Sequence, residues 1–369
     1  MKKLLMYLHP TIKVPMPEGH LIKYPFNQMV NRINPEELNP YPVKLITETF
    51  HEIAALPSHT KTFEELCLES ALNFKKTINE DIYIKYSGGI DSTSAVVAFM
   101  QTWSKEDLER VHIVLSHESI KEFPEMWPVI YETFRGRIHN THLDIRTFAE
   151  KGHVISGEMG DQLWGSSIMY QLEANYGIES VFGPWENVIP RYWYDEHFKG
   201  KAEALAIMKN KPYDDAQAHR ETSMFLERHN SVLKHSTFPI KTAFDWIWWF
   251  NFNNKIHHVL LRDFCWCDLT GLQHRIHSFY NNLDFQRWSL DNHDIKIKKD
   301  FQSYKQPAKD FIIKHTGIQE YDQKLKVGSA IFLWISKNMS KCNFGLDEDY
   351  NLMSQQETFD YVRHHAFKD

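Results

Sequence analysis

The sequence has few cysteines, no long apolar segment and no large excess of either charge. Its 369 residues contain four cysteines (Cys67, Cys265, Cys267 and Cys342), too few for a disulfide framework. No apolar run approaches the roughly 20 residues that span a bilayer, and the apolar part of the first ten residues is too short for a signal peptide. The formal net charge of −6 gives no electrostatic reason to expect a nucleic acid partner. We therefore expect a globular, cytoplasmic protein that binds neither membrane nor nucleic acid.

Two of the cysteines lie near two histidines, as metal ligands often do. Cys265, Cys267, His274 and His277 fall within 13 positions. Zinc sites usually have two residues between paired cysteines, because that spacing lets the chain fold around the ion, whereas a single residue separates this pair. Buried thiols and surface histidines are the favoured explanation, and a zinc site is the alternative.

A strand, a glycine turn and a helix follow one another early in the sequence. Residues 81–86 predict a buried strand, Gly88 and Gly89 a tight turn, and the apolar run 94–103 a helix that packs on the sheet. Adjacent glycines let main-chain N–H groups approach an anion, and nearby hydroxyls add donors. These hydroxyls belong to Ser87, Ser92 and Thr93. No lysine follows the glycines, so this is not a Walker-type loop. The pattern predicts a pyrophosphate site, and an ordinary turn is the alternative.

A second glycine string follows another predicted strand. Residues 153–156 lead into Gly157, Glu158, Gly160 and Asp161. The carboxyl ends of parallel strands meet at one edge of a sheet, where ligands bind. We therefore expect both glycine strings to face the same ligand.

Strand and helix signals alternate between residues 62 and 156. The predicted strands are 82–86, 111–115, a short extended piece at 140–145, and 153–156, and the predicted helices are 92–103, 124–135 and one ending at 151. The helix before them starts at the capping box of Thr62 and Glu65 and buries Phe63, Leu66, Phe74 and Ile78. This order predicts an α/β fold with a parallel twisted sheet and flanking helices.

The rest of the chain has a different composition. The first 60 residues contain eight prolines and little periodicity, which predicts an extended arm. Helical, aromatic-rich segments dominate after residue 165, and the aromatics of 243–250 are spaced for core packing, with base stacking as the alternative. Residues 296–299 are expected to form a solvated basic surface. The expected divisions are an arm over 1–60, a nucleotide core over 61–165, a mainly helical substrate lobe over 166–345 and a tail helix over 346–369.

The two glycine strings together resemble the synthetase domain of asparagine synthetases, in the wider group of ATP pyrophosphatases that share an SGGxDS loop. That family usually has SGEGxDELFGG at the second string. This chain keeps the Ser, Gly, Glu, Asp, Leu and Gly positions and departs at Met159, Gln162 and Ser166. The resemblance implies an adenine-nucleotide α-hydrolase-like fold.

A third stretch extends the resemblance to roughly residues 62–345. Residues 304–309, followed by 324–328, are similar to the family's late K…RxKxGF signature. Lys324 replaces the usual arginine and Ser329 the usual phenylalanine.

The resemblance implies that the cofactors are ATP and Mg²⁺. It places Asp91 and Asp161 on the metal, whose charge would relieve the repulsion between a carboxylate and a triphosphate. A helix-start carboxylate that interacts with the helix dipole is the alternative for Asp91. The implied nucleotide contacts are Lys85, Tyr86, Ser87, Gly88, Gly89, Asp91, Ser92, Thr93, Leu115, Ser156 and Gly157.

Three residues are the catalytic candidates that the resemblance implies. Glu158 would face the adenylated intermediate and orient or deprotonate the amine, and Lys326 would stabilise the charge that develops as the adenylate forms. Lys305 is a further candidate for the triphosphate. The alternatives are an ion-paired structural glutamate and ordinary surface lysines.

The expected activity is an ATP-dependent, AMP-forming amide ligase. It would adenylate a small carboxylate, aspartate or a related acid, and pass it to ammonia or an amine. The sequence begins Met1-Lys2-Lys3 and has about 60 residues before the nucleotide core, so no fused glutaminase is expected and a separate glutaminase partner is one source of ammonia. One alternative is modification of a nucleobase or tRNA carbonyl by amination or by sulfur transfer (thiolation), and another is a non-catalytic nucleotide-binding protein. The sequence does not indicate the oligomeric state.

Overall fold

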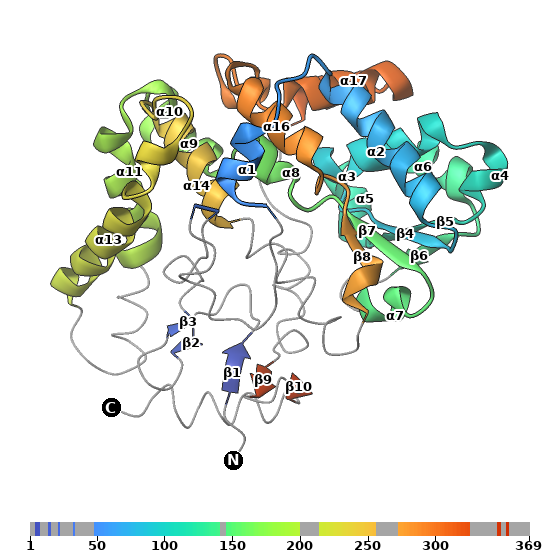
Figure 1. The fold of residues 1–369 in the computed structure, drawn as a ribbon, viewed down its shortest axis with the longest axis horizontal. Helices are drawn as coiled ribbons and strands as arrows, with labels where there is room; N and C mark the ends of the chain where they lie inside the picture. The colour runs from blue at the N-terminus through green and yellow to red at the C-terminus, as the bar shows by residue number, and fades with distance from the viewer. Residues whose placement is uncertain are drawn as a thin grey trace. The chain divides into compact units, whose positions relative to one another are not determined.

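A computed structural model gives the fold of the chain (Figure 1). It describes residues 4–7, 14–15, 21–22, 32–33, 48–140, 145–199, 214–255, 272–324, 345–347 and 352–353. The chain forms two compact units. The described residues of one unit are 48–140, 145–164 and 272–324, and those of the other are 165–199, 214–255 and the short segments near the two ends of the chain.

The first unit contains a five-stranded, all-parallel sheet in the order β6-β5-β4-β7-β8. Its strands are β4 (Ile82–Lys85), β5 (Val111–Leu115), β6 (Ile138–Asn140), β7 (His153–Ser156) and β8 (Ile276–Ser278). The central strand β4 pairs with β5 on one side and β7 on the other, with Ile82 opposite both Val111 and His153. The predicted α/β fold with a parallel sheet is therefore confirmed, and β8 is a strand that the sequence pattern did not indicate.

Helices precede, connect and follow these strands. They are α1 (Phe50–Ala55), α2 (Phe63–Thr77), α3 (Ile90–Thr102), α4 (Lys105–Leu108), α5 (His117–Glu122), α6 (Trp127–Phe134), α7 (Ile145–Ala149), α8 (Gly160–Trp164), α16 (Leu283–Asp291) and α17 (Gln306–Thr316). Short 3₁₀ helices are η3 (Pro124–Met126), η7 (Gln273–Arg275), η8 (His293–Ile295), η9 (Phe301–Ser303) and η10 (Gln319–Gln323). Helices α2, α3 and α17 pack against one another (Figure 1).

The helix before the sheet starts as predicted. The Glu65 N–H donates to Thr62 Oγ1 at 3.2 Å, and the Thr62 N–H donates to Glu65 Oε2 at 2.7 Å. This capping box satisfies donors that the first turn leaves unpaired. Of the expected core residues, Phe63, Leu66 and Ile78 are buried and Phe74 is half-buried.

Residues 272–324 belong to the unit of the sheet, although the sequence pattern assigns them to the helical lobe. The reason is strand pairing at long range, because β8 lies parallel to β7 with Ile276 opposite Val154. In addition, α17 packs on α3 and α2, and α16 packs on α8. The expected boundary after residue 165 nevertheless lies next to the division between Trp164 and Gly165.

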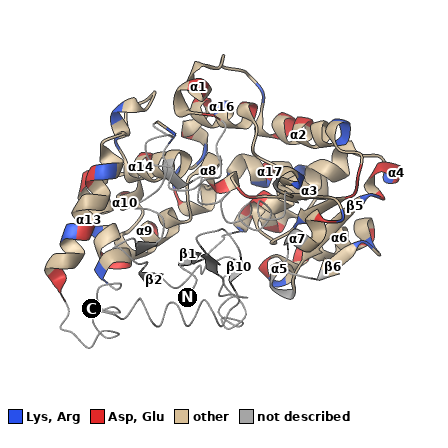
Figure 2. Ribbon diagram, turned by 60° about the horizontal axis from the view of Figure 1, so that its bottom comes forward, with Lys and Arg blue, Asp and Glu red and all other residues tan. Residues whose placement is uncertain are grey.

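The second unit is mainly helical. Its helices are α9 (Ile168–Tyr176), α10 (Glu179–Phe182), α11 (Trp185–Trp193), the π-helix η4 (Tyr194–Lys199), α13 (Asp215–Asn230), the 3₁₀ turn η5 (Leu233–His235), α14 (Ala243–Phe250) and the π-helix η6 (Asn251–Lys255). Trp246, Trp248 and Trp249 are almost fully buried, which confirms core packing for the aromatics of 243–250. Figure 2 shows both signs of charge along α13, as on a solvated helix face.

Short strands lie near both ends of the chain. β1 (Leu4–Tyr7) pairs with β9 (Gly345–Asp347), which also pairs with β10 (Leu352–Met353), and β2 (Val14–Pro15) pairs with β3 (Leu21–Ile22). The described part of the expected tail helix is thus extended, because residues 345–347 and 352–353 supply strands to a sheet. The rest of that tail lies outside the described residues.

The basic stretch 296–299 is only partly solvated, contrary to expectation. Lys298 and Lys299 are exposed, but Lys296 is fully buried. Its ammonium donates to the carbonyl of Ser289 at 2.6 Å and to the Ser289 hydroxyl at 3.0 Å. Carbonyls in the last turn of a helix lack main-chain partners, and the end of α16 supplies one to this lysine.

None of the helices within the described ranges has the length and apolar character needed to cross a membrane.

Two histidine pairs lie across neighbouring strands. His112 Nδ1 and His139 Nε2 are 3.0 Å apart on β5 and β6, and His153 Nδ1 and His277 Nε2 are 2.9 Å apart on β7 and β8. Burial lowers the pKa of all four imidazoles, and that of His277 falls to about 4. A pair of this kind shares one N–H between two ring nitrogens, so a second proton breaks it.

These pairs predict a loss of stability in mild acid. Because the folded-state pKa of His277 lies below its unfolded value of 6.5, its contribution is fully present above pH 6.5 and is lost as the pH falls. Between pH 6.5 and 5 the loss is roughly 2 kcal/mol of unfolding free energy. Urea unfolding at several pH values measures this loss. The unfolding free energy of His277→Asn is expected to fall less steeply with decreasing pH than that of the wild type. Equal slopes for the two proteins would contradict the prediction.

The structure describes two of the four residues in the zinc alternative, His274 and His277. Cys265 and Cys267 lie outside the described residues, His274 is exposed and His277 is paired with His153. Within the described ranges, no three His, Cys, Asp or Glu side chains are grouped to hold a metal.

Candidate functional site

The two glycine strings meet at the carboxyl ends of two adjacent strands. Lys85 at the end of β4 is paired with Ser156 at the end of β7. The chain then turns at Gly88 and Gly89 into α3 and, after β7, at Gly157 into α8. This edge is where ligands bind in parallel sheets.

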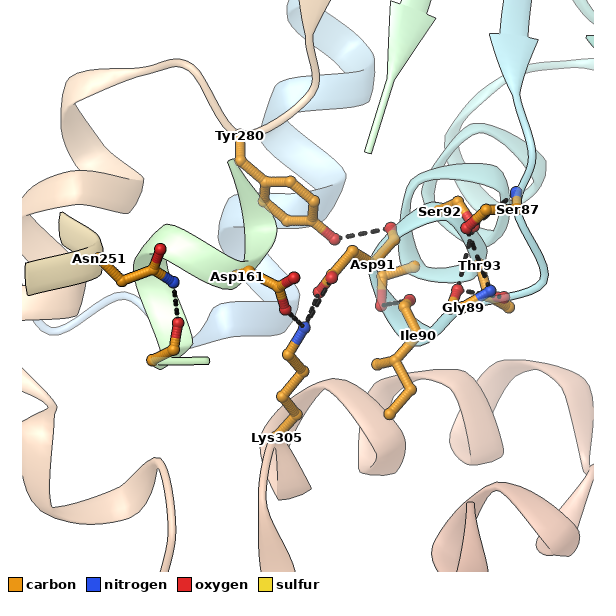
Figure 3. Close-up of polar contacts among 12 residues, drawn as sticks. Ser87, Gly89, Ile90, Asp91, Ser92, Thr93, Asp161, Asn251, Tyr280 and Lys305 are labelled. Atoms are coloured by element: carbon orange, nitrogen blue, oxygen red, sulfur yellow. Dashed lines mark hydrogen bonds and ion pairs between the residues drawn. The ribbon is translucent and has the colours of Figure 1, made fainter. Parts of the chain in front are cut away.

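The first turn is held by its own hydroxyl groups. The Ser87 N–H donates to Ser92 Oγ at 3.1 Å, and the Gly89 N–H donates to Ser87 Oγ at 3.3 Å (Figure 3). The Thr93 hydroxyl donates to the Gly89 carbonyl at 2.9 Å. Gly89 is the N-cap of the 13-residue helix α3 and provides no side-chain cap. The start of α3 therefore keeps the polarity that favours an anion.

Gly88 needs to be glycine for two reasons. Its φ of +76° lies in the left-handed region, which costs other residues about 1–2 kcal/mol. A Cβ at this position would also lie 2.7 Å from Glu122 Cβ, at the end of α5. The turn is thus packed directly against α5.

The central feature of the site is an ion-pair cluster of Asp91, Asp161 and Lys305 (Figure 3). Lys305 Nζ lies 2.8 Å from Asp91 Oδ1, 2.6 Å from Asp91 Oδ2 and 2.7 Å from Asp161 Oδ1. The lysine side chain is 4% exposed, that of Asp91 12% and that of Asp161 44%. Three carboxylate oxygens from two helix starts therefore converge on one buried positive charge. Of the three side chains, that of Asp161 is the most exposed to solvent.

The carboxylates keep the lysine charged. Burial alone would lower the pKa of the Lys305 ammonium, but the charges of Asp161 and Asp91 outweigh this effect, and its pKa is raised. A buried charge is tolerated when it is paired and hydrogen-bonded in this way. The ring of Tyr304, with its centroid 5.4 Å from Nζ, adds a cation–π contact.

Glycines of the second string let the two motifs touch. A Cβ at Gly157 would lie 2.8 Å from the main-chain nitrogen of Ser92, and one at Gly160 would lie 2.7 Å from Asp91 Oδ1. The hydroxyl of Tyr280 donates to the Asp91 carbonyl at 2.8 Å. The position of Asp91 is thus fixed from several sides.

The structure gives a reason why Met159 is tolerated at a position where the resembled family differs. Its φ is +69°, a left-handed conformation that suits glycine, and the family usually has glycine at this position. The side chain of Met159 is almost fully buried. Burial of this apolar side chain offsets the backbone strain.

The segment that follows α17 is bound to the first turn and to α5. The hydroxyl of Tyr321 donates to Thr93 Oγ1 at 3.0 Å. Lys324 Nζ donates to the Glu122 carbonyl at 2.7 Å and lies 4.7 Å from the Phe123 ring centroid. Lys309 Nζ donates to the carbonyls of Gln302 and Asp322, which holds η10 against α17.

The predicted residues are largely brought together. Those of the two glycine strings, with the strand-end residues before them, lie at or beside the carboxyl ends of β4 and β7: Lys85, Tyr86, Ser87, Gly88, Gly89, Asp91, Ser92, Thr93, Ser156, Gly157, Glu158 and Asp161. Leu115 ends the neighbouring strand β5, and Lys305 reaches the two aspartates from the start of α17. The side chain of Glu158 is half-buried, and its carbonyl accepts from the Ser278 hydroxyl. Lys326 lies outside the described residues, so its role stays a prediction.

Two tyrosines of the site were not predicted. Tyr280 and Tyr321 donate to Asp91 and Thr93 from segments about 190 and 230 residues away along the chain. The residues around them carry no glycine string or periodic pattern that would have marked them. Only the pairing of β8 with β7 brings the first of them to the site.

The carboxylates of Asp91 and Asp161 suit a hard divalent cation. Mg²⁺ prefers oxygen ligands, and it is commonly held by one or two carboxylates together with substrate phosphates. The oxygens of both aspartates already converge on one cation, the Lys305 ammonium. These residues therefore fit the metal that the resemblance implies.

Comparisons of the chain with protein families, curated proteins and solved structures found no match.

Proposed function

We propose that the protein is an ATP-dependent, AMP-forming amide ligase with an adenine-nucleotide α-hydrolase-like fold. The observation that carries the proposal is the convergence of Asp91 and Asp161, each from a glycine string, on a single positive charge. A lysine-free turn before α3 supports it, because Gly89 leaves the start of this helix without a side-chain cap, and a helix N-terminus favours a pyrophosphate.

In the proposed reaction, the carboxylate oxygen of an acid attacks the α-phosphorus of ATP. The bond from this phosphorus to the bridging oxygen breaks, and pyrophosphate leaves with the bond's electron pair. An amine or ammonia then attacks the acyl carbon, loses a proton and displaces AMP. Mg²⁺ would neutralise the phosphates and polarise the α-phosphorus.

The residues of this chain have separate tasks in this scheme. The start of α3 would bind the departing pyrophosphate, and Asp91 and Asp161 would hold the metal. Glu158 orients the amine or accepts its proton, and Lys326 stabilises the developing charge.

The sulfur-transferring alternative has less support from the described residues. Cys67 is fully buried in α2, and burial raises the pKa of its thiol well above the usual value. A thiol in that state is a poor nucleophile. The other three cysteines lie outside the described residues.

The test is the identity of the nucleotide product. The purified protein is incubated with Mg²⁺, ATP and panels of small acids and amines, with and without RNA, and products are separated by ion exchange. We expect AMP and pyrophosphate in equal amounts, with an acid and an amine but without RNA. ADP with orthophosphate would contradict the proposal, dependence on RNA would favour base modification, and ATP binding without turnover across the panels would favour a non-catalytic role.

A further inference from the structure

Lys305 occupies the position at which the two aspartates would hold a metal. Its ammonium lies within 2.8 Å of three carboxylate oxygens, two from Asp91 and one from Asp161. An ammonium and a divalent cation cannot share this position, because both need the same oxygens and repel each other. Metal binding must therefore displace the lysine side chain.

The main chain of Lys305 is held by hydrogen bonds that do not depend on its side chain. The Lys305 N–H donates to the Lys296 carbonyl at 3.0 Å, and its own carbonyl accepts from Ala308 and Lys309 at the start of α17. Its backbone is left-handed, with φ of +62°, a strained conformation of the kind that clusters at functional sites. The flexible four-carbon side chain can leave the carboxylates by rotation about its own bonds.

We propose that Lys305 is a resident cation that assembles the metal site and competes with the metal for it. In its presence the two carboxylates stay together although like charges repel. A metal that binds without nucleotide takes the carboxylates from the Lys305 ammonium and leaves that charge without an anionic partner, which is unfavourable. Magnesium and ATP together bring the replacing cation and also an anion that receives the ammonium, so the nucleotide favours the exchange. The inference rests on the proposed function only in taking Asp91 and Asp161 as metal ligands.

If a metal ion replaces the Lys305 ammonium at Asp91 and Asp161, removing the charge of the lysine should strengthen metal binding. Free Mn²⁺ is titrated into the protein without nucleotide and followed by electron paramagnetic resonance. We expect Lys305→Met to bind Mn²⁺ at least about tenfold more tightly than the wild type. The exposed Lys298→Met is the matched control and is expected to match the wild type. Adding Asp161→Asn to Lys305→Met is expected to abolish the gain.

Unchanged or weaker binding by Lys305→Met would overturn the proposal, as would a gain that survives Asp161→Asn. If Lys305→Met does not fold, Lys305→Gln keeps a donor between the carboxylates without the charge and must show the same gain. A variant that folds only with added Mn²⁺ supports the exchange, and one that no divalent ion rescues contradicts it. Since no nucleotide is used, the result is independent of the ligase reaction, which the product assay tests separately.

Discussion

Replacement of Asp161 by asparagine is expected to lower ATP–pyrophosphate exchange at least about 100-fold with little loss of stability. The substitution removes an anionic oxygen from the proposed metal site, and a divalent metal supplies several kcal/mol of transition-state stabilisation. Asp161 is 44% exposed and Asp91 continues to pair with Lys305, so the loss of unfolding free energy stays well below the roughly 3–5 kcal/mol that an unpaired buried charge costs.

The control for this variant is Asp310→Asn. Asp310 is an exposed carboxylate on α17, five residues after Lys305, and it accepts from the Gln306 side chain instead of from the cluster. Its exchange rate is expected to equal that of the wild type. An Asp161→Asn protein with wild-type exchange would show that this carboxylate holds no metal required for the reaction.

Gly160→Ala is expected to disrupt the site by steric displacement. A Cβ at Gly160 would lie 2.7 Å from both Cβ and Oδ1 of Asp91, closer than real Cβ contacts. Because Asp91 is also held by Lys305 and Tyr280, it cannot move without breaking these bonds. We expect a loss of about 1–3 kcal/mol in unfolding free energy and at least about a 100-fold loss of exchange activity.

Gly136→Ala serves as the comparison, since it separates backbone strain from contact with Asp91. Gly136 has a φ of +83° and nothing within 4 Å of an added Cβ. Alanine there costs about 1–2 kcal/mol through its left-handed backbone and is expected to leave activity unchanged. Chemical unfolding and pyrophosphate exchange on both variants measure the two effects. Gly160→Ala with full activity would mean that the contact between the second string and Asp91 has no part in the reaction.

The sheet could be predicted because its signals are local. The strands 82–86, 111–115 and 153–156 are short apolar runs followed by helices, and the structure has β4, β5 and β7 at these positions. β8 is only three residues long and follows β7 by about 120 residues, so no local pattern connects it to the sheet. Its pairing assigns residues 272–324 to the sheet unit, against the expected division.

The sequence predicted which residues form the site, but it did not predict how their charges are paired. Glycine strings at neighbouring strand ends brought Asp91 and Asp161 together as expected. Lys305 was a candidate for the triphosphate, and nothing in the sequence indicated that it would bridge the two aspartates. Lys296 shows the same limit, because a lysine in a basic run is expected at the surface unless long-range packing supplies carbonyl partners.

The most direct test of the shared metal is a crystal structure with Mn²⁺ and a non-hydrolysable ATP analogue. Anomalous scattering locates the ion independently of any assumption about the site. We predict one anomalous peak coordinated by both Asp91 and Asp161, phosphates at the start of α3, and Lys305 Nζ moved away from the carboxylates. An ion or nucleotide bound elsewhere, with the Lys305 ion pairs intact, would contradict this account.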